Sequence, residues 1–202
     1  FMRKPESRKV LAQPSYAPQS ATRLDTRGIL AGRYGRPTAF PATFPARLDG
    51  KVYLVEGRTL TVGDVAIAHG AGLIMVKGGN LRITGNIQYT SQQVDRARDL
   101  ASVGWLVLKD RVKDAQGQLV DVGGDIIIDP EVTEVVGAFY AEGTVRTGST
   151  GSVTADEPLT IRGVIIAHRL LFERLAGSLG AGAERIIADG RASIDDMVRW
   201  SS

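Results

Sequence analysis

The sequence predicts an all-β protein of the right-handed β-helix type, a solenoid with one inserted helix and an extended N-terminal arm. The first observation is a repeated tetrapeptide of three apolar residues and one ionisable residue, followed by glycine in five of its six copies. A short apolar run suits a buried strand, and glycine permits a sharp corner where the strand reaches solvent. The second is that the expected strands are short and interrupted by only one sizeable helix, which argues against a doubly wound sheet. The copies occupy residues 53–56, 66–69, 74–77, 139–142, 165–168 and 186–189.

Three regions are expected along the chain. Residues 1–48 hold six of the eight prolines and predict an extended arm, because such a composition cannot bury a core of its own. If the arm is ordered, either the body of its own chain or a neighbouring copy must hold it. The β-helix body is expected over residues 49–192, and residues 193–202 are expected to form a short C-terminal helix or tail.

Within the body, the apolar pattern predicts most elements as short strands. A helix of about three turns is expected over 90–103, where apolar residues share one helical face and Thr90 with Gln93 has capping-box spacing. Residues 110–123 are polar and predict a loop, and the glycine-rich 175–182 predicts a turn. A β-sandwich is the open alternative, although its strands would alternate more strictly. The expected strands are 52–55, 60–62, 65–68, 73–76, 81–83, 87–89, 105–108, 126–128, 135–141, 144–146, 159–161, 164–167, 170–172 and 186–188.

Composition limits the classes of function. The chain has 202 residues and a formal charge of +3, with its basic residues scattered among acidic ones except in the first 36 residues. Nucleic-acid binding is not expected, because it needs a concentrated basic stripe. The absence of cysteine excludes disulfides and thiol catalysis, and no apolar run is long enough for a membrane span. Arginine exceeds lysine and only two asparagines occur, which suits a thermophile. Starting with Phe1, the chain is expected to be a processed product or a fragment.

Three segments carry a family resemblance. Residues 78–87 (GGNLRITGNI), 123–130 (GGDIIIDP) and 139–143 (FYAEG) together resemble a β-helical module of bacterial cell-surface and pilus-associated proteins. The likeness spans about residues 50–191, and it extends more loosely to the bactofilins, short β-solenoids that polymerise end to end. The resemblance implies an exported, non-catalytic scaffold and offers no catalytic residue to carry over. The arm lies outside it.

The expected function is that of a non-catalytic structural protein, located at the cell surface or outside the cell, whose partners are copies of itself. The two ends of a solenoid carry unpaired strands, so a filament or ordered array can form through the ends and the arm by strand addition. No cofactor is expected. The arm residues expected to make assembly contacts are Arg3, Lys4, Val10, Leu11, Tyr16, Leu24, Ile29, Leu30 and Tyr34.

The alternative function is a polysaccharide-binding or display module on a cell surface. Aromatic side chains are the usual platforms for sugars, and at 6% this chain is poorly supplied with them. Tyr53, Tyr89 and Tyr140 are the candidates, although Tyr53 and Tyr140 lie within apolar triplets.

Little in the sequence suggests catalysis. His69 and His168 fill the slot that holds Glu, Lys or Asp in the other tetrapeptides, which indicates an exit to solvent. Asp125 and Asp129, four residues apart, are a candidate cation site, with a solvated turn as the simpler interpretation. The adjacent carboxylates Asp195–Asp196 lie at the chain end, so no enzyme is expected.

Overall fold

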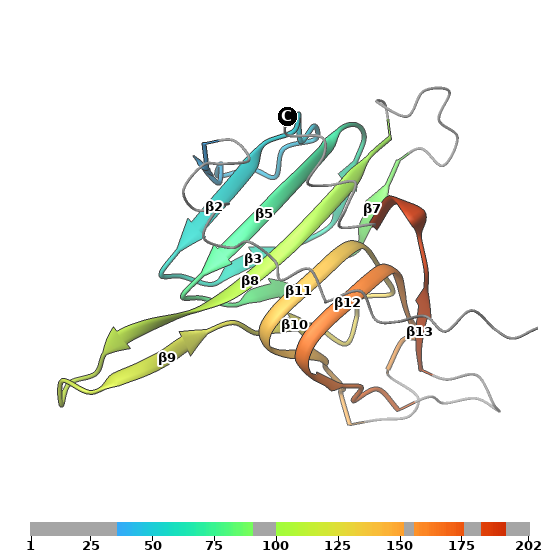
Figure 1. The fold of residues 1–202 in the computed structure, drawn as a ribbon. Helices are drawn as coiled ribbons and strands as arrows, with labels where there is room; N and C mark the ends of the chain where they lie inside the picture. Colours follow the sequence, from blue (N-terminus) through green and yellow to red (C-terminus); the bar gives the residue numbers. More distant parts are fainter. Residues whose placement is uncertain (1–35, 91–99, 152–155, 176–182, 193–202) are drawn as a thin grey trace, which may run out of the picture.

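A curled sheet of mostly parallel strands forms the protein, shaped like half a barrel (Figure 1). The computed structural model describes residues 36–90, 100–151, 156–175 and 183–192, and in these ranges all regular structure is β except the 3-10 turn η2 at Gly190–Ala192. The strands are β1 (Thr38–Ala39), β2 (Val52–Glu56), β3 (Leu60–Val62), β4 (Val65–Ile67), β5 (Ala71–Lys77), β6 (Leu81–Ile83), β7 (Ile87–Tyr89), β8 (Ser102–Lys113), β9 (Leu119–Gly123), β10 (Ile126–Ile128), β11 (Glu134–Thr147), β12 (Leu159–Leu171) and β13 (Glu184–Ile187).

The strands pair along three parallel tracks. The first runs β1–β2–β5–β8–β11–β12, and the second runs β3–β6–β10 before joining the later parts of β11 and β12. The third holds β4 with β7 and, further along, the first residues of β11 and β12 with β13. Val52 pairs with Leu73 and Leu60 with Leu81, so in both tracks the paired residue lies the same number of residues further along the chain. We call each such passage through the tracks a circuit. Parallel pairing excludes the sandwich alternative, whose strands are antiparallel.

The core consists of apolar side chains stacked from one circuit to the next. In β6, Leu81 and Ile83 are fully buried while Arg82 between them is exposed, and β10 repeats the arrangement with Ile126 and Ile128. The register places Ile126 beside Leu81 and Ile128 beside Ile83. Each such side chain contributes about 1.5–3 kcal/mol on burial, so these columns hold the circuits together.

An aromatic cluster closes the N-terminal end of the core. The ring centroids of Phe40 and Phe44 are 5.8 Å apart, Phe44 lies 6.0 Å from Trp105, and Trp105 stacks on Phe139 at 6.2 Å. Leu48 is fully buried in the same core. Residues 36–48, which were expected to belong to the arm, therefore pack on the body of their own chain. Residues 1–35 lie outside the described part.

The inserted helix is not seen. Of the segment 90–103, residues 91–99 lie outside the described part, and Ser102 and Val103 belong to strand β8. Val103 is fully buried and pairs with Gly72 of β5, so at the end of the expected helix tertiary burial overrides helical spacing. The predicted C-terminal helix at 193–202 also lies outside the described residues.

The predicted loop at 110–123 is instead a hairpin that projects from the sheet (Figure 1). Strand β8 continues to Lys113 and pairs with β9 in antiparallel fashion around a turn closed by Asp114, whose Oδ1 accepts hydrogen bonds from the backbone N–H groups of Gln116 and Gln118. The ribbon has no buried face, since even Val112, Leu119 and Val120 on it are exposed, so its apolar residues lack the alternation that marks a strand.

Two long strands replace expected pairs and triplets of short ones. Strand β11 spans both 135–141 and 144–146, with a bulge between Ala141 and Thr144, and β12 spans all three expected strands from 159 to 172 except the last residue. Glycine serves the expected corners elsewhere: Gly57, Gly70 and Gly78 have φ of 66°, 81° and 69°, a region that other residues rarely adopt.

Candidate functional site

The candidate cation residues do not converge on one point. Asp125 and Asp129 flank β10, and because a strand rises about 3.3 Å per residue their Cα atoms are about 13 Å apart. Asp125 Oδ1 accepts a hydrogen bond of 2.7 Å from Thr144 N–H, while the Asp129 carboxylate binds Arg82 through two guanidinium nitrogens. This pairing raises the pKa of Arg82. Within the described residues, no group of three or more His, Cys, Asp or Glu side chains is arranged to hold a metal.

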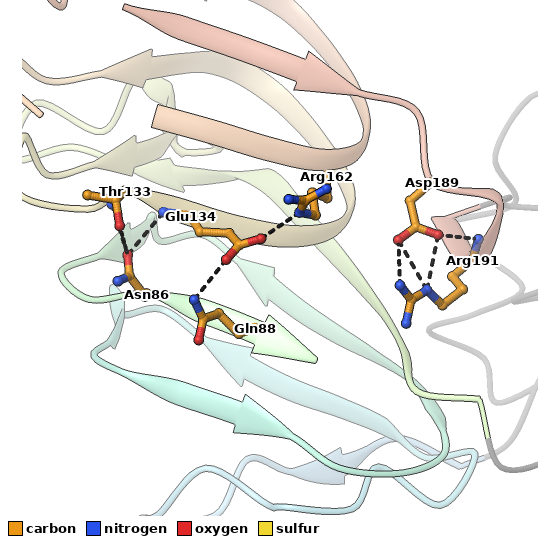
Figure 2. A network of polar contacts seen from close by, with 7 residues as sticks. All are labelled: Asn86, Gln88, Thr133, Glu134, Arg162, Asp189 and Arg191. Atoms are coloured by element: carbon orange, nitrogen blue, oxygen red, sulfur yellow. Dashed lines mark hydrogen bonds and ion pairs between the residues drawn. The ribbon is translucent and has the colours of Figure 1, made fainter. Parts of the chain in front are cut away.

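Both asparagines of the chain hold corners of neighbouring circuits together. Asn80 Oδ1 accepts a hydrogen bond of 3.1 Å from Asp125 N–H. Asn86 Oδ1 accepts from the N–H groups of Thr133 and Glu134 at 2.8 and 3.0 Å and from the Thr133 hydroxyl at 3.2 Å (Figure 2). These side chains satisfy backbone donors that the corners withdraw from the strand ladders. The rarity of asparagine in the sequence predicts a habitat and does not by itself point to these two corners.

A charged network continues from this corner across the third track (Figure 2). Gln88 Nε2 donates to one carboxylate oxygen of Glu134 at 2.8 Å, and Arg162 Nε donates to the other at 2.6 Å. The network therefore joins β7, β11 and β12. Its carboxylate is engaged on both oxygens, which suits a structural role better than acid–base chemistry.

The three candidate tyrosines, Tyr53, Tyr89 and Tyr140, are all at least partly buried. Tyr53 is 5% exposed, and Tyr140 packs against a small cluster that includes Met75. The ring of Tyr89 is covered by the guanidinium of Arg191, 4.6 Å from its centroid, and its hydroxyl accepts a hydrogen bond from Val103 N–H. Burial raises the pKa of Tyr89 to about 12.

The histidines lie where the repeated tetrapeptide places them. His69 and His168 are both exposed, as expected for residues at an exit to solvent. No nucleophile with a matching orienting group adjoins either of them among the hydrogen bonds of the described residues. The assembly residues expected in the arm, from Arg3 to Tyr34, all lie outside the described part.

A hollow of about 580 Å³ lies at the base of the β8–β9 hairpin. Its lining is charged throughout, and Glu142 is already engaged by the backbone N–H of Lys109 at 2.8 Å. Arg111 pairs with Asp121 across the hairpin. Three acidic and two basic side chains line the hollow, and Asp110 also pairs with Lys77. With its charges paired in this way, the hollow has no clear preference for an anion or a cation. The lining residues are Lys109, Asp110, Arg111, Asp121 and Glu142.

Near the C-terminal end of the core, Arg174 is a buried anchor. Its guanidinium donates to the carbonyl oxygens of Val132, Glu157 and Asp129 at 2.6, 2.5 and 2.8 Å. Burial lowers the pKa of Arg174. In the neighbouring turn, hydrogen bonds hold the pKa of Asp156 well below its usual range, the largest contribution coming from the backbone N–H of Leu175.

The feature that stands out is the outer edge of β12. Strand β11 pairs with the inner edge of β12 from Thr160 to Leu171, but β13 covers the outer edge only along Leu159–Arg162. No other strand of the described residues pairs there, and we call residues 163–171 the open edge. Ile166 and Leu170 on it are 42% and 40% exposed, and the adjoining Phe172 is 49% exposed. Unpaired backbone groups beside apolar side chains are a template for another strand.

The sequence departs from the repeat at this edge. Of the six repeated tetrapeptides, only 165–168 is followed by arginine in place of glycine. In the structure Arg169 pairs with Thr144 and the strand continues through this position to Leu171. Strand β11 also continues past its exit residue although Gly143 follows it, so the missing glycine alone does not identify a strand that continues.

No protein-family model matches this chain, and no curated protein or solved structure matches it either. Across the described ranges, no helix combines the length and apolar character that crossing a membrane requires.

Proposed function

We propose that the protein is a β-solenoid that serves as a non-catalytic structural protein of the bacterial cell surface and assembles with copies of itself. The observation that carries the proposal is the open edge, where a long, apolar strand has no partner among the described strands over most of its outer side. The surface location rests on the resemblance to β-helical modules of cell-surface proteins.

The three parallel tracks support the solenoid. Successive strands change track at each corner and return one position further on, as the pairs β2–β5 and β3–β6 illustrate. Columns of buried side chains such as Leu60, Leu81 and Ile126 continue through the circuits. A right-handed sense is part of the proposal, since parallel crossovers are right-handed in nearly all proteins.

A second copy is the partner we propose for the open edge. The edge follows β12 from the first track to the second, because Val164–Ala167 pairs on the inner side with the first-track part of β11 and Arg169–Leu171 with the second-track part. A partner that pairs along this edge must bend around the same corner. Strands of this chain already do so, as β11 shows. Backbone pairing supplies affinity, and Ile166 and Leu170 add apolar contact.

The internal engagement of the charged groups supports a structural role over a catalytic one. Asp125, Asp129 and Glu134 all accept hydrogen bonds that join neighbouring circuits. The N-terminal arm is kept as a second contact in the proposal, through the basic and apolar residues named from the sequence.

The test places a lysine on the open edge. Ile166→Lys puts a charge on the exposed edge strand, which natural sheets use to prevent edge-to-edge pairing. Ile127→Glu is the control, because Ile127 lies on β10, whose two sides are already paired, and its register partners Arg82 and Arg146 favour a carboxylate there. Sedimentation velocity and electron microscopy over a concentration series should show assemblies for the natural sequence and the control, and monomers for Ile166→Lys. A natural chain that stays monomeric at all concentrations, or an Ile166→Lys variant that assembles normally, would refute the proposal.

A deletion separates the arm from the edge. Removing residues 1–35 leaves Phe40, Phe44 and Leu48 in the core, so the body should remain folded. If the arm is a second contact, the truncated chain should assemble at higher concentrations than the full chain and lose assembly entirely with Ile166→Lys. Equal assembly with and without residues 1–35 would remove the arm from the proposal.

A further inference from the structure

Strand β13 covers one end of the edge that β12 presents, and its own packing is slight. Within the described part of the chain its four residues pair only with Leu159–Arg162, and Ile186 is 48% exposed. Glu184 provides an anchor at its start, where Oε1 accepts hydrogen bonds from the Thr147 hydroxyl at 2.6 Å and from Arg174 N–H at 3.0 Å. A strand of this length at the margin of a sheet is weakly held unless its other end is also fixed.

After β13 the chain does not follow the path of the earlier circuits. In the first circuit, β4 leads directly into β5, which pairs on the first track with β2. The equivalent step after β13 would place a strand on the open edge. Instead the chain turns back past β12, β11 and β8, and the red segment in Figure 1 ends beside β7.

Two contacts join the returning segment 189–191 to distant strands, and a third links two of its own residues. The Ser102 hydroxyl donates to Arg191 O at 2.6 Å, and the Arg191 guanidinium lies 4.6 Å from the centroid of the Tyr89 ring. The Asp189 carboxylate accepts from Arg191 Nε at 3.1 Å and from Arg191 N–H at 3.0 Å (Figure 2). The side chains of Arg191 and Asp189 are 18% and 16% exposed, so the pair is largely withdrawn from solvent. The attraction between a cation and an aromatic ring is stronger when both are withdrawn from water in this way.

We propose that segment 189–191 is a latch that restrains assembly. While it is closed, it holds β13 on β12 and directs the chain away from the open edge. When it opens, β13 leaves Leu159–Arg162, and the outer edge of all 13 residues of β12 becomes available to a second copy. This inference rests on the proposed function, because it assigns the regulation of the same edge.

The latch explains why β13 is short and peripheral while its following segment is buried against distant strands. Tyr89 belongs to β7 and Ser102 to β8, whereas β13 follows β12, the sixth strand of the first track. A contact that spans so many circuits closes a long loop of chain. Releasing this contact returns conformational freedom to β13 and segment 189–191, while β12 keeps its full pairing with β11.

The test opens the latch and measures the strand and the assembly separately. Arg191→Ala removes the contact with Tyr89 and the ion pair with Asp189, and Ser102→Ala is a milder second variant that loses one hydrogen bond. Arg185→Ala is the matched control, because Arg185 is an exposed arginine on β13 itself. Hydrogen exchange of residues 184–187 should be at least about tenfold faster in Arg191→Ala than in the control, with β11 unchanged. The concentration at which half the protein is assembled should fall by about tenfold.

The two readouts distinguish this inference from the function on which it rests. Unchanged exchange at 184–187 in Arg191→Ala would overturn the latch, whatever the protein assembles into. Faster exchange with unchanged assembly, in a chain whose assembly Ile166→Lys abolishes, would overturn the regulation and leave the proposed function standing. If neither the natural chain nor the opened variant assembles, both proposals fall, while the exchange rates still report whether the segment fixes β13.

Discussion

Asn86→Ala tests whether the corner side chains hold the circuits together. The substitution removes an oxygen that accepts three hydrogen bonds, from Thr133 N–H, Thr133 Oγ1 and Glu134 N–H. Two backbone donors then lose their acceptor at a partly buried corner. Each unsatisfied donor costs about 1–3 kcal/mol, and partial access of water favours the lower end, so we expect a loss of about 2–3 kcal/mol in the free energy of unfolding. For a chain of this size that corresponds to about 4–12 °C in melting temperature.

Urea unfolding followed by far-ultraviolet circular dichroism measures this loss. Asn80→Ala removes a single, longer hydrogen bond to Asp125 N–H and should cost about 1 kcal/mol. Thr61→Ala, at an exposed position of β3, should change stability by less than about 0.5 kcal/mol. An Asn86→Ala variant as stable as Thr61→Ala would refute the role of the corner oxygen, because only the change at Asn86 leaves two backbone donors without an acceptor.

Three further predictions concern a corner glycine and two titratable groups. Gly79→Ala should cost about 2–3 kcal/mol or more in urea unfolding, because the added methyl collides with the backbone of Arg58, while Gly190→Ala, which has open space, should cost little. Asp156→Asn should make stability less dependent on pH in acid. The depressed pKa of Asp156 stabilises the fold above about pH 4, the unfolded value, and this stabilisation is lost as the pH falls. The urea midpoints at pH 7 and pH 3 should therefore differ less in the variant than in the natural protein. Because the pKa of Tyr89 is raised to about 12, its contribution to stability is complete below about pH 10 and is lost as the pH rises towards 12. Tyr89→Phe should therefore lose less stability at alkaline pH than the natural protein, and an equal loss in both proteins would contradict this.

The short strands were the part of the fold most open to prediction from sequence. The expected strands at 60–62, 81–83, 87–89 and 126–128 match the structure residue for residue. In each of these runs an exposed or half-exposed residue lies between two more deeply buried ones or follows one, so local pattern and burial agree. Long strands were less accessible, since β11 and β12 pass the corner through a bulge at Ala141–Thr144 without ending there, and a bulge leaves no consistent mark on composition.

The candidate site was largely hidden for a related reason. Ile166 belongs to a repeated tetrapeptide whose other copies include fully buried residues, such as Met75 at the position that corresponds to Ile166. Whether a copy is buried or exposed depends on whether another circuit follows it in space. That is a property of the stacking order, and a single tetrapeptide carries no information about it.

By itself the sequence determined the β class, the positions of most corners and the solvent slots of the charged residues, because these depend on the polarity and backbone freedom of a few neighbouring residues. Only the tertiary structure decided which groups meet across circuits: Asn86 with Thr133, Arg174 with three carbonyl oxygens, and Arg191 with Tyr89. It also decided which edge of the sheet stays open. The physical reason is that each of these contacts joins residues separated by one or more circuits, and insertions of unequal length between strands make that separation unreadable from local pattern.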